Sequence, residues 1–278
     1  MKSRGEVEQG VAQWVVWWLN ERRKKLVEQL SDSMSVNPFL LPLLFEFHGL
    51  TNFGQLSDLV VSGHLYIGHA TGFGKLIDEK ILPGVFGTTK LSKAVRNSTP
   101  PLALHIFDEI DHVVTRPDGS SELLSLKAGR WTIQLTMAVQ LNAAFNAILR
   151  DHPGHFRNIV VGVFYGSADS LTDKYDILRG INRGAHHNVI DLTEHVQVYA
   201  GRAFWAWLND GEPATQDWVL AGIERGIALH REFEERQPKK VVEYLRDYAN
   251  EVRAQYDHFI DPATGAADWN RVLTSING

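Results

Sequence analysis

The stretch "FDEIDHVVTRPDGSSELLSLKAGRW", residues 107–131, decides the fold. Two largely apolar runs are separated by Pro117, Asp118 and Gly119, residue types that favour a tight turn. This pattern predicts a β-hairpin over residues 104–127. Lys127 ends the second run among leucines, and a lysine is rarely buried without a partner.

Periodicity predicts the elements on either side of the hairpin. Helices are expected over 8–31, 52–66, 71–87, 132–150 and 202–211, and strands over 158–166 and 195–201. The helix over 71–87 is expected to stop at Pro83-Gly84. The order predicts an α/β core, with a mixed central sheet flanked by helices, between helical N- and C-terminal extensions. We expect an N-terminal helical region over 1–70, a core over 71–210 and a C-terminal helical region over 211–278.

Composition narrows the class of protein. The net charge is −5, so strong non-specific binding of nucleic acid is not expected as the main activity. The absence of cysteine excludes disulfides and thiolate metal sites. The most apolar early run, residues 11–19, is shorter than the roughly 20 residues of a membrane span. We expect a cytoplasmic protein with no membrane partner and no organic cofactor.

The hairpin predicts a chemical site. Alternate residues of a strand share a face, so Ser125 and Lys127 lie together, and the facing strand can bring Asp111 to them. A carboxylate suits Mg²⁺, a hard cation, and a lysine can position a water or stabilise charge on a phosphate. These residue types are typical of a metal-dependent phosphodiesterase.

The constellation resembles the core of the PD-(D/E)XK nucleases, with Asp111 as the first acid and Lys127 as the lysine. The second acid of that motif is replaced by Ser125, and no Asp or Glu occurs from 123 to 150. The second metal-binding carboxylate is therefore expected upstream. Glu79, on the preceding helix, is preferred, and Glu109, on the face of Asp111, is the alternative.

Longer strings extend the resemblance. They are "TGFGKLIDEKILP", "FDEIDHV", "LLSLKAG", "WTIQLTMAVQLN", "NIVVGVFYG", "LTDKY", "ILRGIN" and "HNVID", in this order. The chain resembles type II restriction endonucleases that cut the interrupted site RGGNCCY. The resemblance implies a homodimer that cleaves both strands of double-stranded DNA with Mg²⁺, leaving 5′-phosphate and 3′-hydroxyl ends. In such an enzyme the N-terminal helical region would serve dimerisation or clamp the DNA.

Base reading is expected from "ILRGINRGAHHN", residues 177–188, because Arg pairs with guanine and Asn with adenine. The candidates are Arg179, Asn182, Arg183, His186, His187 and Asn188, of which the two arginines suit a GG/CC core. Gly180 and Gly184 would permit close backbone approach. Candidate phosphate contacts are Lys75 and Arg130, with Lys90, Lys93 and Arg96 as further possibilities. His112 is expected to be a surface residue of its strand.

Two alternatives remain. One is a PD-(D/E)XK nuclease that selects DNA structure instead of sequence. The other is a catalytically silent DNA-binding or assembly module, for which Ser125 at the acid position is the main argument.

Overall fold

The computed structural model describes residues 1–29, 37–99, 102–129, 132–182, 186–257, 259–261 and 266–277. The chain forms two compact units. Unit 1 comprises Met1–Val15 and Gly74–Ile227, and unit 2 comprises Val16–Phe73 and Ala228–Gly278. Each unit is assembled from separated stretches of chain, whereas the sequence suggested three consecutive regions.

The helices of the two units account for most of the described residues. Their bounds are α1 Arg4–Gln29, α2 Leu40–Phe47, α3 Phe53–Leu76, α4 Leu82–Phe86, α5 Lys93–Ser98, α6 Leu135–Asp151, α7 Lys174–Ile177, α8 Arg202–Leu208, α9 Thr215–Glu235, α10 Val241–Asp257 and α11 Trp269–Asn277. The unit boundaries fall within α1, α3 and α9. No helix in the described residues is both long and apolar enough to cross a membrane.

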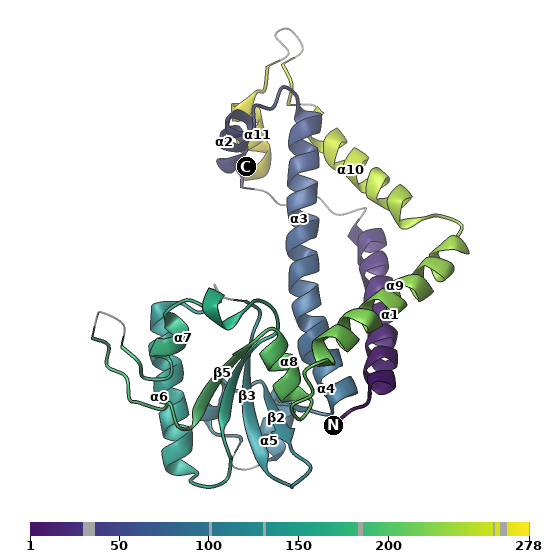
Figure 1. The fold of residues 1–278 in the computed structure, drawn as a ribbon. Helices are drawn as coiled ribbons and strands as arrows, with labels where there is room; N and C mark the ends of the chain where they lie inside the picture. The colour runs from purple at the N-terminus through teal and green to yellow at the C-terminus, as the bar shows by residue number, and fades with distance from the viewer. Residues whose placement is uncertain are drawn as a thin grey trace. The chain divides into compact units, whose positions relative to one another are not determined.

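Unit 1 contains a five-stranded sheet in the order β1-β2-β3-β4-β5 (Figure 1). The strands are β1 Thr89–Lys90, β2 His112–Thr115, β3 Ser121–Lys127, β4 Ile159–Val163 and β5 Val196–Ala200. The first three strands pair antiparallel, and β3, β4 and β5 pair parallel. The predicted α/β class with a mixed sheet between helices is confirmed.

Helices cover both faces of this sheet (Figure 1). On one face, Leu141 and Phe145 of α6 pack in a core cluster with Leu123 and Val161. On the other, a side chain at Gly162 would overlap the Phe204 ring of α8, so the ring lies directly on the strand. All five residues of β4 are buried, as expected for an apolar strand covered on both sides.

The helical run before the sheet differs from the prediction. The helices predicted over 52–66 and 71–87 are continuous as α3, and α3 leads through a π-helical turn, Ile77–Ile81, into α4. The Leu82 amide donates to the Ile77 carbonyl, the five-residue spacing of a π turn. Pro83 therefore lies in the first turn of a new helix, where its missing N–H is not needed, and does not end the helix.

The hairpin is also shorter than predicted. Residues 105–107 form a 3₁₀ turn, and the first strand begins at His112. The second strand, Ser121–Lys127, lies where the apolar run after the turn predicted a strand. The prediction over 104–111 was wrong because Phe107 and Ile110 bury as loop residues in the core instead of alternating along a strand.

Unit 2 has its own core. Leu26, Leu56, Tyr248 and Val252 belong to a buried cluster that draws on α1, α3 and α10. Phe53 contacts Trp269 of α11 with ring centroids 5.6 Å apart.

Candidate active site

Two carboxylates in unit 1 share one ammonium group. The Lys90 Nζ donates to Asp78 Oδ1 and Oδ2 at 2.7 and 2.6 Å and lies 3.6 Å from Asp111 Oδ1. Asp78 comes from the π turn, Lys90 ends β1, and Asp111 immediately precedes β2. These three residues form the acidic cluster.

His112 lies beneath the cluster and holds Asp78 in position through a hydrogen bond. Its ring is fully buried, with Nε2 2.8 Å from Asp78 Oδ1 and Nδ1 2.9 Å from Thr88 Oγ1. Because a carboxylate only accepts hydrogen bonds, Nε2 carries the proton toward Asp78. The expectation that His112 is a surface residue was wrong.

The cluster also sets the charge state of Asp78. Burial acts to raise its pKa, but hydrogen bonds from His112 and Lys90 outweigh burial, so the pKa of Asp78 lies below its ordinary value. Asp78 is therefore ionised at neutral pH and available to a cation.

Asp111 connects the cluster to β3. Its Oδ2 accepts a hydrogen bond of 2.7 Å from the Leu126 amide, and its own amide donates to the Leu124 carbonyl at 2.8 Å. The register pairs His112 with Leu124, so Asp111 lies beside Ser125. Asp111 therefore lies against β3, as predicted, and its hydrogen bonds are to the backbone of that strand.

Ser125, which stands at the usual acid position, is fully buried. Its Oγ has no hydrogen-bond partner among the described residues. Its strand neighbours Leu123 and Val161 belong to the core, so a carboxylate here would need to be desolvated. A hydroxyl is tolerated at this place more easily than a charge.

Lys127 lies half-buried at the end of β3. Within the described part of the chain it makes no hydrogen bond or ion pair, and the cationic partner of Asp111 is Lys90. Strand alternation places Lys127 on the face of Ser125, the residue beside Asp111. Among the described residues, however, the ion pair of Asp111 is with Lys90, and the expected Asp111–Lys127 ion pair is not formed.

The structure places the two predicted upstream acids outside the cluster. Glu79 is exposed in the π turn, and the neighbouring Asp78 points to Lys90 in its place. Glu109 lies in a turn, so it does not share a strand face with Asp111 as the alternation suggested. Neither glutamate makes a hydrogen bond or ion pair with another residue that the structure describes.

Glu122 belongs to a separate ion pair. Arg116 Nε donates to Glu122 Oε2 at 2.5 Å, and Arg116 Nη1 donates to the Trp207 carbonyl at 2.9 Å. Glu122 is therefore engaged by Arg116 and takes no part in the acidic cluster.

Arg96, another candidate phosphate contact, has a largely buried guanidinium that is bonded to this chain's own backbone. Its guanidinium donates to the carbonyls of Leu91, Phe107 and Ile110 at 2.9, 2.6 and 2.7 Å. These bonds hold the loop that leads into Asp111. Sequence inspection missed this role because carbonyl acceptors leave no trace in residue identity.

The predicted base-reading segment is tied down by a residue that the sequence did not single out. The buried Asn142 of α6 donates to the Leu178 and Ile190 carbonyls at 3.1 and 2.8 Å and accepts from the Ile190 amide at 2.9 Å. Gly180 has φ +92°, and a Cβ there would lie 2.0 Å from the Ile190 carbonyl oxygen. The close approach expected at Gly180 is to this chain's own backbone.

The candidate DNA contacts differ in how they are held. Arg179 is partly buried and donates through Nε to the Val196 carbonyl at 3.2 Å. Asn182 Oδ1 accepts from the partly buried His187 amide at 2.8 Å. His186, Asn188 and Lys75 are exposed, and Arg183, Gly184 and Arg130 lie outside the described residues.

The cluster suits one metal by its donor chemistry. Among the described residues no group of three or more His, Asp or Glu side chains is arranged to hold an ion. Mg²⁺, however, is commonly bound through one or two carboxylates, with waters and phosphate oxygens as the remaining ligands. Asp78 and Asp111 already converge on the ammonium group of Lys90. The two carboxylates therefore fit Mg²⁺ once that group moves away.

Comparison of the chain with protein-family models gives no match, and comparison with curated proteins gives none either. The fold and the acidic cluster are therefore the features of the chain that indicate its function.

Proposed function

We propose that this protein is a Mg²⁺-dependent endonuclease of the PD-(D/E)XK type that cuts both strands of double-stranded DNA at a short interrupted pseudo-palindromic site. The product ends would be 5′-phosphate and 3′-hydroxyl, and the active form would be a homodimer. Cleavage at a specific sequence is proposed because several strings of this chain resemble type II restriction endonucleases.

One observation carries the proposal: Asp78 and Asp111 converge on a single cation at the open end of the β2–β3 hairpin. The surrounding topology is compatible with a PD-(D/E)XK core. Three antiparallel strands are followed by the α6 crossover to the parallel strand β4. Asp78 replaces Glu79 as the helix-borne acid in this proposal.

Each residue has a distinct role in the proposed reaction. Asp78 and Asp111 hold the cation, and His112 keeps Asp78 ionised and oriented. When bound, Mg²⁺ would lower the pKa of a coordinated water and withdraw charge from the phosphate. Lys127 would position the attacking water or stabilise the developing charge. Lys90 would leave the carboxylates and pair with a DNA phosphate.

The test is cleavage of plasmid DNA of known sequence in Mg²⁺, followed by sequencing of the fragment ends. Discrete fragments with a common end sequence support a restriction endonuclease, whereas scattered cuts indicate a structure-selective nuclease. Asp111→Asn and Lys127→Ala should abolish cleavage and retain specific DNA binding. Lys239→Ala, at a partly exposed lysine to which the proposal gives no role, is the matched control. Full activity of Lys127→Ala would reject its assigned role.

A second function is favoured by Lys90 itself. An ammonium group held by both carboxylates can replace a metal ion electrostatically, and Ser125 is buried without a partner. These features suit a catalytically silent DNA-binding module. Binding to DNA in EDTA, with no cleavage at any Mg²⁺ concentration, would establish this alternative.

A further inference from the structure

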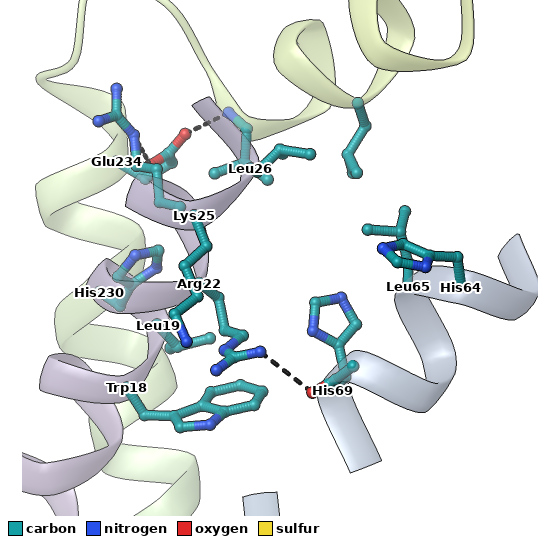
Figure 2. Close-up of a pocket in the computed structure, with 14 residues that line it drawn as sticks. Trp18, Leu19, Arg22, Lys25, Leu26, His64, Leu65, His69, His230 and Glu234 are labelled. Carbon is teal, nitrogen blue, oxygen red and sulfur yellow. Dashed lines mark hydrogen bonds and ion pairs between the residues drawn. The ribbon is translucent and has the colours of Figure 1, made fainter. Parts of the chain in front are cut away.

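Unit 2 contains a pocket that the proposed DNA cleavage does not use. Its volume is about 410 Å³, within the range of small-molecule sites. The lining residues come from α1, α3, α9 and α10, and all of them belong to the parts of these helices in unit 2 (Figure 2).

The larger part of the wall is apolar. Its apolar lining residues are Trp18, Leu19, Leu26, Leu65, Val241 and Leu245. Trp18 meets the His69 ring edge-on, with centroids 6.0 Å apart. A wall of this kind favours a flat hydrocarbon or aromatic body over a hydrated phosphodiester chain.

Arg22 is held rigidly in the pocket. Its guanidinium lies over the Trp18 ring, 5.6 Å from the centroid, and Nη1 donates to the Gly68 carbonyl at 3.0 Å (Figure 2). Gly72 leaves the space that the guanidinium occupies, because a Cβ there would lie 2.7 Å from Arg22 Cζ. Arg22 is thus preorganised to receive an anion, at little cost in side-chain entropy.

Several polar atoms of the lining are buried without a hydrogen-bond partner among the described residues. They are Trp18 Nε1, Arg22 Nε and His230 Nε2, together with Arg23 Nε and Glu234 Oε2, which form an ion pair with each other at 3.5 Å. A buried polar group without a partner is costly, and a ligand that satisfies it recovers this free energy. Three unpaired atoms in one pocket therefore point to a bound molecule.

The charge of the pocket favours an anion. Arg22, Arg23 and Lys25 line it, with Glu234 as the one carboxylate among its lining residues. Glu234 is engaged, since its Oε2 lies 3.5 Å from Arg23 Nε and its Oε1 accepts from the Val241 amide at 2.5 Å. Arg22 and Lys25 are left to face a ligand.

We propose that this pocket binds a small organic anion with a flat aromatic body, its ring against Trp18 and the aliphatic wall and its acidic group at Arg22. The site is separate from the acidic cluster and does not depend on the proposed nuclease function. It would give the protein a second ligand beside DNA.

The probe for the test is anilinonaphthalenesulfonate, an aromatic sulfonate whose fluorescence rises in apolar sites. The full-length wild-type protein should bind it at one saturable site. Arg22→Gln should weaken binding about tenfold, the effect of losing a charge-assisted hydrogen bond. Leu245→Trp, which fills the pocket, should remove binding. Arg231→Gln, at an exposed arginine of α9, should bind as the wild type does. Unchanged binding by both pocket variants would overturn the proposal.

A second measurement remains informative if Arg22→Gln does not fold. The chain has no cysteine, so Leu65→Cys introduces a single thiol in the pocket. Saturating anilinonaphthalenesulfonate should slow its alkylation by iodoacetamide several-fold and leave Glu232→Cys, at an exposed position of α9, unaffected. Equal alkylation rates with and without the probe would overturn the proposal.

Discussion

The acidic cluster of unit 1 and the pocket of unit 2 both gather charged side chains, but they differ in how completely those side chains are paired. In the cluster, Asp78, Lys90 and Asp111 each have a partner, and the supporting His112 is hydrogen-bonded at both ring nitrogens. In the pocket, polar atoms of Trp18, Arg22 and His230 are buried without one among the described residues.

This difference separates two kinds of site. A fully paired cluster is stable by itself, and an incoming cation must displace an internal partner, so binding competes with a salt bridge. A pocket with unpaired donors is destabilised until a ligand arrives, so binding adds stability. Four predictions follow from this difference, and each changes residues at either the acidic cluster or the pocket.

The largest effect is expected from the carboxylate of the π turn. If the proposed function holds, Asp78→Asn should lower Mg²⁺-dependent cleavage by about a hundredfold or more, because it removes a proposed metal ligand. Glu79→Gln should change the rate by less than about twofold, since Glu79 is exposed and outside the cluster. Initial rates of plasmid cleavage over a Mg²⁺ series compare the two variants. A larger loss in Glu79→Gln would return the ligand role to Glu79.

The next effect concerns stability. His112→Ala should lower the free energy of unfolding by about 3 kcal/mol, because it leaves a cavity and removes a partner of partly buried Asp78 and of buried Thr88. Urea denaturation followed by circular dichroism measures the change. His105→Ala is the matched control, at a side chain that is 95% exposed, and should change stability by less than about 0.5 kcal/mol. Equal stability of the two variants would contradict a structural role for His112.

Lys90→Met tests the competition directly. Removal of the ammonium group should strengthen Mg²⁺ binding without DNA by about tenfold, because no internal cation then occupies the carboxylates. Isothermal titration calorimetry gives the affinity independently of cleavage, and Lys93→Met should bind as the wild type does. Weaker binding by Lys90→Met would show that Lys90 supports the metal site.

The smallest effect concerns the pocket and pH. Burial lowers the pKa of His69 and of His230, and Arg22 and Arg23 respectively lower them further, against an opposing effect of Glu234 on His230. The unfolded state then binds protons more readily, so this contribution to stability is present above about pH 6.5 and is lost as pH falls through the lower pKa values of the folded state. The His69→Gln, His230→Gln double variant should show a flatter loss of urea midpoint on acidification than wild type. Parallel curves would reject the involvement of both histidines.

The fold could be predicted where an apolar run follows a clear turn signal or is continuous enough for a buried strand. The apolar run after the turn at 117–119 and the continuous apolar run of Ile159–Val163 both predicted strands that the structure contains. The predicted helix end at Pro83 and the predicted longer first strand were wrong. In both places the backbone takes a less common turn, and such turns depend on tertiary contacts more than on local pattern.

The sequence predicted the residue types of the candidate site, but not which side chains pair with one another. Asp111 lies beside β3 as expected, because hairpin register follows from the turn. Asp78 was missed because a π turn changes which residue of a helix faces the sheet, and one residue of phase exchanges Asp78 with Glu79. His112 was assigned to the surface because residue type alone does not show which face of a strand is buried. Lys90 was expected as a phosphate contact, and its ion pairs were missed because an ion pair between sequence-distant residues has no local signature.

The π turn has an evolutionary consequence. A π turn is equivalent to an α-helix with one residue inserted, and such turns often occur at functional sites. Deleting a single residue between Ile77 and Ile81 could restore an uninterrupted α-helix while rotating its carboxylates relative to β1. Among related chains, a gap of one position in this segment would therefore matter more to the acidic cluster than many substitutions elsewhere, and an alignment that ignores it would pair the wrong acids.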